Sequence, residues 1–432
     1  MRDDGARSVA SGPSRPSALP ATSPPLGVVR RIRGAFYLPR NAWILTATST
    51  VWSIGGSLSS PYQSLYFYSL GASVVFIGYL AALSSAIIAV AELIGGFVGD
   101  VWGRKRAIIL FSFVGVANGF ILAFVPSAGW LFLPVVVGSV AGIYGPLFST
   151  ALTESMEPAM RPRGIASYSV INIVPSLFAP YVGGLLVERF GDVSGLRVAF
   201  FLSGVFGVLG ITWRALTLEE THAPEARVTF LRFWRSILRE SRAAYHAAGG
   251  DVHRLLYYAI LSAFGVGLTA SFSILYFVQA LGVPAYEYGA LVGATSFVIM
   301  LLLFPAASLA ERVGLKKAVV LASLSVPLNQ YFFTLAKNVD ELVAWSVVSG
   351  TGTAFLGPPL TSLQAGIVPR MIRGRIMAIF SALPLLASIP AQIVGGYLYA
   401  IAPVLPFLVA VPVFVLSLLV LLRIREPEHL ER

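Results

Sequence analysis

Twelve apolar stretches recur along this 432-residue chain, and they restrict its fold more than any other feature. Each has about 20 residues, enough for an α-helix to cross roughly 30 Å of hydrocarbon. A β-barrel would instead show shorter segments of alternating polarity. Charged residues make up only 12% of the chain, about half of their share in a soluble protein. The sequence therefore predicts an all-α membrane protein with spans at 42–69, 73–98, 106–126, 129–152, 165–187, 196–216, 254–281, 285–310, 317–336, 340–366, 376–400 and 404–423.

The loops between the spans carry very different charge on the two sides of the predicted bundle. One side has Arg104, Lys105, Arg106, Arg161, Arg163, Arg312, Lys316, Lys317, Arg370, Arg373 and Arg375. The other side has only Arg189, Arg197 and Lys337. Because basic loops stay on the inner side, we expect the first side, both termini and the central loop to face the cytoplasm from the plasma membrane. The net charge of +11 then reflects topology and contact with anionic lipid, and no nucleic-acid partner is expected.

This pattern divides the chain into a disordered cytoplasmic tail at 1–36, a six-helix bundle at 37–216, a cytoplasmic linker at 217–252, a second six-helix bundle at 253–425 and a C-terminal tail at 426–432. The first tail is rich in Ser, Pro, Ala and Arg and lacks the apolar core of a signal peptide. In the linker, Phe230, Trp234 and Ile237 share one helical face, and the arginines lie mostly off it. Residues 229–247 therefore predict an interfacial amphipathic helix that links the two halves.

The two bundles are repeats of each other. Landmarks recur at offsets of 210 to 212 residues: Leu65-Tyr66-Phe67 with Leu275-Tyr276-Phe277, Leu70-Gly71 with Leu281-Gly282, Gly78 with Gly289, Gly145-Pro146 with Gly357-Pro358, and Gly183-Gly184 with Gly395-Gly396. Six spans are an even number, so the two halves cross the membrane in parallel orientation. Such repeats are related by an axis along the membrane normal, with the solute path between them. The repeat thus favours a transporter that rocks two rigid halves.

The loop after the second predicted span reads Gly96-Phe-Val-Gly-Asp100-Val-Trp-Gly103-Arg104-Lys105-Arg106. Its small residues permit close helix packing, and its acid can interact with the positive N-terminus of a neighbouring helix. The loop resembles the signature of the major facilitator superfamily, G-x-x-x-D-[RK]-x-G-[RK]-[RK], with Val101 in place of the usual basic residue. A degenerate copy one repeat later carries Glu311, Arg312, Gly314, Lys316 and Lys317. The resemblance covers residues 37–425 and implies the 12-helix fold of that family, with some likeness to its drug-efflux members.

The resemblance also implies a gating role for this loop. In the family, the acid of the motif contacts the eleventh helix and stabilises the outward-facing state. The residues assigned to the gate are Gly96, Asp100, Gly103, Arg104, Lys105, Arg106, Glu311, Gly314, Lys316, Lys317, Glu154 and Arg163. The alternative is that these residues only set topology and cap helices.

Within the spans, Glu92 stands out among very few ionisable residues, about 12 Å deeper than Asp100 at the rise of an α-helix. Ionisable side chains inside membranes are usually functional, so Glu92 is the candidate for proton coupling. The alternative is a structural hydrogen-bond acceptor near the gate. No Lys or Arg lies clearly at mid-depth, which argues against a strongly anionic substrate.

In the family, the first, fourth, seventh and tenth spans line the central path. The substrate-cavity candidates on these spans and on their neighbours are Trp52, Tyr62, Gln63, Tyr66, Tyr144, Asn172, Ser273, Tyr276, Gln279, Thr353, Gln364 and Gln392. As a set they predict an aromatic, weakly polar pocket, which suits a neutral or amphipathic solute.

We expect a secondary active transporter that works by alternating access and exports lipophilic or amphipathic small molecules, with proton antiport as its coupling mechanism. One alternative is an uptake carrier, by symport or uniport, for a neutral solute such as a sugar. Another is a non-transporting membrane sensor. The sequence shows no nucleotide loop, metal-ligand cluster or nucleophile motif and has no cysteine, so neither an enzyme nor a cofactor or metal is expected. Family precedent implies a monomer in contact with membrane lipid.

Overall fold

The computed structural model describes residues 38–158, 160–220, 230–336 and 339–425. The predicted tails at 1–36 and 426–432 lie outside these residues, as does the part of the linker at 221–229. Every regular element within the described ranges is helical, which confirms the predicted all-α class.

The first half contains α2 (Arg40–Ser59), α3 (Gln63–Ser69), α4 (Val74–Trp102), α5 (Arg104–Phe124), α6 (Phe132–Val140), α7 (Tyr144–Glu154), α8 (Arg161–Phe190) and α9 (Asp192–Thr217). A 3-10 turn at Ser60–Tyr62 joins α2 to α3, because Pro61 has no N–H to continue the α-helical ladder. A second 3-10 turn at Ala141–Ile143 joins α6 to α7. The eight helices therefore form six spans.

The second half contains α11 (Gly250–Thr269), α12 (Ser273–Leu275), α13 (Ala285–Val313), α14 (Leu315–Leu335), α15 (Val339–Ile367), α16 (Arg373–Ile401) and α17 (Leu405–Leu422). A π-helical turn at Tyr276–Ala280 continues α12, so that α11, α12 and this turn form the seventh span. In the linker, α10 (Phe230–Ala247) occupies almost the whole stretch in which a helix was predicted.

The observed helices agree with the twelve predicted spans to within four residues at each end. Within the described part of the chain, ten helices are long and apolar enough to cross a membrane. The two remaining spans are α2–α3 and α15. Both are less apolar for a visible reason, because α2 carries the hydroxyl-rich run 46–50 and α15 carries serine, glycine, threonine and proline through its middle at 349–359.

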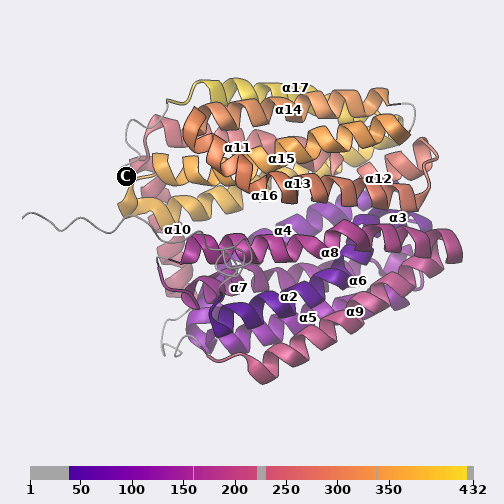
Figure 1. Cartoon of the computed structure of the whole chain (residues 1–432), viewed down its shortest axis with the longest axis horizontal. Helices are drawn as coiled ribbons and strands as arrows, with labels where there is room; N and C mark the ends of the chain where they lie inside the picture. Colours follow the sequence, from indigo (N-terminus) through magenta and orange to yellow (C-terminus); the bar gives the residue numbers. More distant parts are fainter. Residues whose placement is uncertain (1–37, 159, 221–229, 337–338, 426–432) are drawn as a thin grey trace, which may run out of the picture. The chain divides into compact units, whose positions relative to one another are not determined.

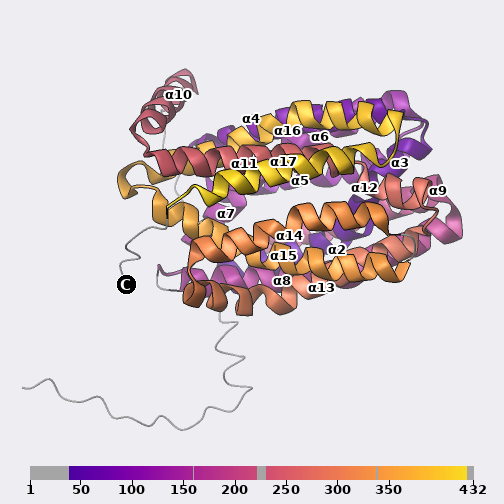
Figure 2. The same cartoon turned by 90° about the horizontal axis from the view of Figure 1, so that it is seen from above.

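The two halves lie side by side in Figure 1, where α4 runs along α16 and α8 runs along α13. We call the end of the bundle that carries Arg104, Arg161, Arg312 and Arg375 the basic end, and the other one the opposite end. Figure 2 shows α10 at the basic end, next to the start of α11. There Glu240 of α10 forms an ion pair with Arg375 of α16, with an N···O distance of 2.9 Å.

The backbone repeats the sequence symmetry at its turns. Gly71 and Gly282 follow the first and seventh spans with φ of +93° and +67°. Gly103 and Gly314 separate α4 from α5 and α13 from α14 with φ of +85° and +104°. Only glycine adopts such values without strain, so each pair marks an equivalent sharp turn in the two halves.

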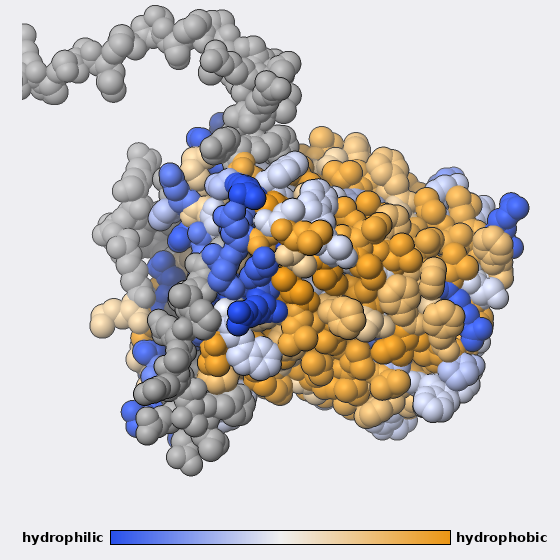
Figure 3. All heavy atoms as spheres, turned by 90° about the horizontal axis from the view of Figure 1, so that it is seen from below, coloured by the Kyte–Doolittle hydropathy of each residue, from blue (hydrophilic) through white to orange (hydrophobic). Residues whose placement is uncertain are grey.

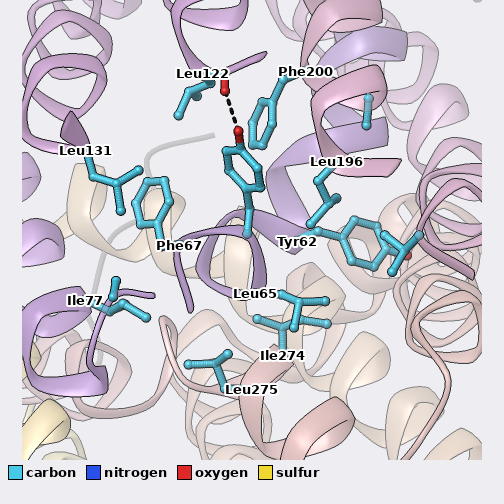
Figure 4. Close-up of a cluster of buried hydrophobic side chains, with 14 of the residues drawn as sticks. Tyr62, Leu65, Phe67, Ile77, Leu122, Leu131, Leu196, Phe200, Ile274 and Leu275 are labelled. Atoms are coloured by element: carbon cyan, nitrogen blue, oxygen red, sulfur yellow. Dashed lines mark hydrogen bonds between the residues drawn. The ribbon is translucent and has the colours of Figure 1, made fainter. Parts of the chain in front are cut away.

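Three hydrophobic clusters show where the two halves are joined. At the opposite end, one cluster combines Leu65 and Phe67 of the first half with Ile274 and Leu275 of the second (Figure 4). At the basic end each half has a cluster of its own, with no described buried residue from the other half. The halves are thus packed together at the opposite end and have separate cores at the basic end.

Glycines bring the two backbones into contact at the junction of the halves. A Cβ atom on Gly184 of α8 would collide with the Cα atom of Tyr286 of α13. A Cβ atom on Gly289 would likewise collide with the carbonyl oxygen of Pro180. This close approach is typical of helices packed within a membrane.

The outer surface is apolar over much of its area. Figure 3 shows hydrophobic side chains across the middle of one face and hydrophilic ones gathered toward its two ends. Phe124, Leu216 and Ile401 are 72%, 80% and 76% exposed. Such an apolar surface on a water-soluble protein would cause association, whereas lipid covers it in a bilayer.

Candidate functional site

A cavity of about 430 Å³ lies among α2, α7 and α8, and we call it the first-half cavity. Its lining residues are Ser49, Trp52, Ser53, Gly56, Ser57, Ser60, Tyr144, Tyr168 and Asn172. Three of them, Trp52, Tyr144 and Asn172, are predicted cavity residues that the structure brings together. The serines of α2 and Tyr168 were missed. The spacing of Ser49, Ser53 and Ser60 on one helical face is a signal by which the sequence could have indicated them.

The wall of this cavity is held by short contacts. The rings of Trp52 and Tyr144 have centroids 5.4 Å apart. The Asn172 side chain donates a hydrogen bond to the carbonyl oxygen of Tyr168 at 3.2 Å, which fixes the amide on its own helix. Gly115 of α5 leaves the space that the Trp52 ring occupies, because a Cβ atom there would come within 2.9 Å of the ring. The arrangement offers an aromatic face beside several hydroxyl groups.

Arg214 is a buried cation beside this cavity, with only 1% of its surface exposed. Its guanidinium donates hydrogen bonds to Thr48 at 2.9 Å and to Ser49 at 3.1 Å. It also donates to Ser112 at 3.2 Å and to Tyr144 at 3.0 Å. All four acceptors are hydroxyl oxygens.

The prediction that no Lys or Arg lies clearly at mid-depth did not take account of Arg214, whose side chain reaches into the bundle. Thr48 and Ser112 lie eight residues from the starts of α2 and α5, or about 12 Å from the basic end. Arg214 belongs to the last turn of α9, but side chains of a helix tilt toward its N-terminus. Since α9 begins at the opposite end, the Arg214 side chain is directed into the bundle and away from the basic end.

Two further polar hollows contain other predicted residues. One of about 380 Å³ toward the opposite end is lined by Gln63 and Gln392, and the Gln392 amide donates a 2.9 Å hydrogen bond to Ser85 across the two halves. Another of about 250 Å³ lies in the second half and includes Ser273 and Asn329. The structure thus places the predicted polar residues in several hollows.

Tyr62, Tyr66 and Tyr276 are packed into the hydrophobic cluster at the opposite end, outside the first-half cavity. Figure 4 shows Tyr62 in this cluster. The remaining candidates also lie elsewhere: Gln279 borders a hollow beside Tyr399, Thr353 is exposed on α15, and Gln364 is half-buried on the same helix.

The loop motif forms a compact ion cluster. A guanidinium nitrogen of Arg104 lies 3.1 Å from the Asp100 carboxylate and 3.3 Å from that of Glu154. The Arg104 side chain is only 9% exposed because it packs on Gly99, where a Cβ atom would collide with it. Three residues of the predicted gate, Asp100, Arg104 and Glu154, are therefore in contact. All three belong to the first half.

Other members of the predicted gate are more dispersed. The backbone N–H of Lys105 donates a 3.0 Å hydrogen bond to Glu220, and Gly96, Arg106 and Arg163 are exposed. In the second half, Gly314 provides the turn before Lys316 and Lys317, which lie at the start of α14. The side chain of Glu311 lies outside the described part of the structure.

Glu92 is half-buried on α4. Gly78 and Ser85 precede it at steps of seven residues, so all three lie near one face of the helix. That face meets α16, since Gly78 contacts the Gln392 backbone and Ser85 the Gln392 side chain. Among the described residues, Glu92 has no hydrogen-bond or ion-pair partner, and no group of three acidic or histidine side chains gathers as around a metal ion.

Comparison with known proteins agrees with this geometry. The family model described as Major Facilitator Superfamily matches residues 45–250 and 255–432. The multi-drug resistance efflux pump PmrA of Streptococcus pneumoniae is 23% identical over 334 residues, which cover 74% of this chain and 80% of the pump. The MFS-type transporter YqjV of Bacillus subtilis is 24% identical over 327 residues, or 73% of this chain and 76% of that protein. The structure of the nucleoside transporter NupG superposes with a TM-score of 0.75 at 15% identity, covering 89% of this chain and 100% of the other.

Proposed function

Since this chain belongs to the major facilitator superfamily and is a secondary transporter of a small molecule, we propose that it exports lipophilic or amphipathic compounds. The observation that carries this proposal is the first-half cavity, in which the Trp52 and Tyr144 rings face hydroxyl groups. Such a wall suits a molecule with an apolar body and a polar group. The similarity to a protein named as a multidrug efflux pump supports the same direction of transport.

The proposed topology places the basic end in the cytoplasm and the chain in the plasma membrane. The support is the positive-inside rule, applied to the loops that carry Arg104, Arg161, Arg312 and Arg375. Both termini then lie inside the cell, and the separate cores at the basic end correspond to an inward-facing state. One chain contains both halves of the transport path, so we take the monomer as the working unit.

Transport by alternating access then requires two changes. The junction at the opposite end, built on Gly184 and Gly289, must separate, and the halves must approach at the basic end. The cluster of Asp100, Arg104 and Glu154 borders the surface of the first half that closes. We assign it the gate, with Arg104 holding both carboxylates in place for contact with the start of α16.

Proton antiport through Glu92 completes the proposal. A half-buried carboxylate on the face of α4 that meets the other half is placed to respond when the two halves move. Binding a proton removes a charge that is costly to bury, so protonation and closure at the basic end would favour each other.

The test uses lipid vesicles that contain the protein and a pH-sensitive dye. We expect lipophilic and amphipathic compounds, but not sugars, to trigger proton flux, and Glu92→Gln to abolish it. Glu188→Gln is the matched control, because Glu188 is an exposed carboxylate at the other end of the bundle. Equilibration of a labelled sugar without proton flux would replace the export proposal with an uptake uniporter and leave Glu92 a structural role.

A further inference from the structure

Arg214 is held in an environment that contains no anion among the described residues. Its four hydrogen-bond partners are hydroxyl groups, and its guanidinium carbon lies 5.5 Å from the centre of the Tyr144 ring and 5.6 Å from that of Phe148. Burying a cation without a paired anion is costly, and Arg214 forms no ion pair with a described carboxylate, so its charge creates a local positive potential. The first-half cavity adjoins this potential through Ser49 and Tyr144.

Among the hydroxyl groups that accept hydrogen bonds from Arg214, at least one keeps a hydrogen that it does not donate to the others. A guanidinium only donates, so every one of its hydroxyl partners acts as an acceptor toward it. Thr48 passes its own hydrogen to the carbonyl oxygen of Ile44 at 2.7 Å. The oxygens of Ser49 and Tyr144 are 3.4 Å apart, and only one hydrogen can lie between them. The second hydroxyl hydrogen of this pair therefore has no partner within the pair, and both groups line the cavity.

We propose that Ser49 and Tyr144, held and polarised by Arg214, form a subsite for a carboxylate of the transported molecule. Arg214 does not line the cavity, so it is a positioning residue that acts through the two hydroxyl groups. Hydrogen bonds to a charged acceptor are about twice as strong as neutral ones, and the positive charge behind the donors adds to this preference. Trp52 and Tyr168 then take the apolar part, which makes the substrate class an amphipathic organic acid.

The subsite belongs to one half only. Arg214 comes from α9, and its partners come from α2, α5 and α7, all in the first half. The acid group would therefore stay bound to one rigid body while the second half moves relative to it. This inference refines the proposed export function, because it names the chemistry that the same cavity selects.

The test measures binding of three probes that share one ring system, with the protein in phosphatidylcholine nanodiscs at neutral pH. The probes are 2-naphthoate, 2-naphthylmethanol and 2-naphthylmethylammonium. We expect wild type to bind 2-naphthoate about tenfold more tightly than the alcohol, as one charge-assisted hydrogen bond allows. Tyr144→Phe and Ser49→Ala should each remove most of this ratio.

Two further variants separate positioning from folding. Arg214→Gln should reduce the ratio of acid to alcohol affinity to about one, while Tyr168→Phe, which removes a hydroxyl of the same cavity that is not bonded to Arg214, should leave the ratio intact. If Arg214→Gln fails to fold, Tyr144→Phe alone decides the question, because it keeps the ring. Equal affinity of wild type for the acid and the alcohol overturns the subsite.

The outcome is independent of the vesicle assay. Proton flux with neutral lipophiles but no acid preference would retain the export function and overturn the subsite. Acid preference without any transport in vesicles would retain the subsite and overturn the export function.

Discussion

The hydroxyl group of Tyr62 lies 3.1 Å from the carbonyl oxygen of Ala285, which belongs to the other half of the molecule. The same hydroxyl lies 2.5 Å from the carbonyl oxygen of Pro180, so its single hydrogen is shared between α8 of its own half and the start of α13 in the other half. Tyr62 is fully buried at this position. It therefore joins the two halves at the opposite end.

We predict that Tyr62→Phe shifts the protein toward the state in which the opposite end is open. Loss of one buried hydrogen bond is worth about 1 kcal/mol, or roughly a fivefold change in the two populations. The chain has no cysteine, so the rate at which an impermeant maleimide labels Ser84→Cys from that side measures the shift directly.

Tyr66→Phe is the matched control for this measurement. The Tyr66 hydroxyl is equally buried, but it donates to the carbonyl oxygen of Leu122 within the same half, at 2.7 Å. Equal labelling rates in the two variants would mean that Tyr62 does not seal the junction.

Gly289→Ala should block the state described here. The added methyl group would collide with the Pro180 carbonyl oxygen and with the Tyr62 hydroxyl group, so the junction cannot close. We expect loss of transport and fast labelling of Ser84→Cys. Gly357→Ala is the control, since a Cβ atom at Gly357 meets no other atom within 4 Å. Normal transport by Gly289→Ala would show that the halves do not need this contact.

Arg104 and Glu154 should be energetically coupled. Their side chains are 9% and 32% exposed, so the ion pair is partly shielded from water. A double-mutant cycle with Arg104→Gln and Glu154→Gln, based on unfolding in detergent, should give a coupling energy of about 1 kcal/mol. The same cycle with Arg106→Gln, which alters an exposed cation of the same loop, should give a value close to zero. Equal coupling energies in the two cycles would show that Arg104 has no specific interaction with Glu154.

Gly103→Ala should destabilise the fold. Gly103 is the single residue between α4 and α5, with φ of +85° and ψ of 150°, a region that only glycine occupies readily. The expected cost is about 1–3 kcal/mol, seen as a lower thermal unfolding midpoint in detergent. Gly249→Ala, at φ of −71°, should cost much less. A midpoint for Gly103→Ala as high as that of Gly249→Ala would contradict this reasoning.

The spans and turns were accessible from sequence because they depend on local properties. Apolar length sets a membrane-crossing helix, and Gly103 and Gly314 stand where the repeat requires sharp turns. Trp52, Tyr144 and Asn172 were found because polar and aromatic side chains inside a span need an interior surface. These inferences do not depend on how the halves pack.

The positions of Tyr62 and Arg214 could not be predicted in the same way. Tyr62 bridges the junction only because the halves meet there, and the sequence does not specify at which end they meet. Arg214 stands in the last turn of its span, where a basic side chain is expected to extend toward the headgroups. Its opposite direction depends on hydroxyl groups contributed by three other helices.

Because α4 pairs with α16 and α8 pairs with α13 along their lengths, the peptide between α9 and α10 is not needed to hold the two halves together. The contacts that hold the halves together come from the transmembrane helices, and each half has a separate hydrophobic core at the basic end. The connecting peptide then serves mainly to raise the effective concentration of one half around the other. Two separately synthesised halves that meet in the same bilayer should consequently be able to recognise each other and assemble.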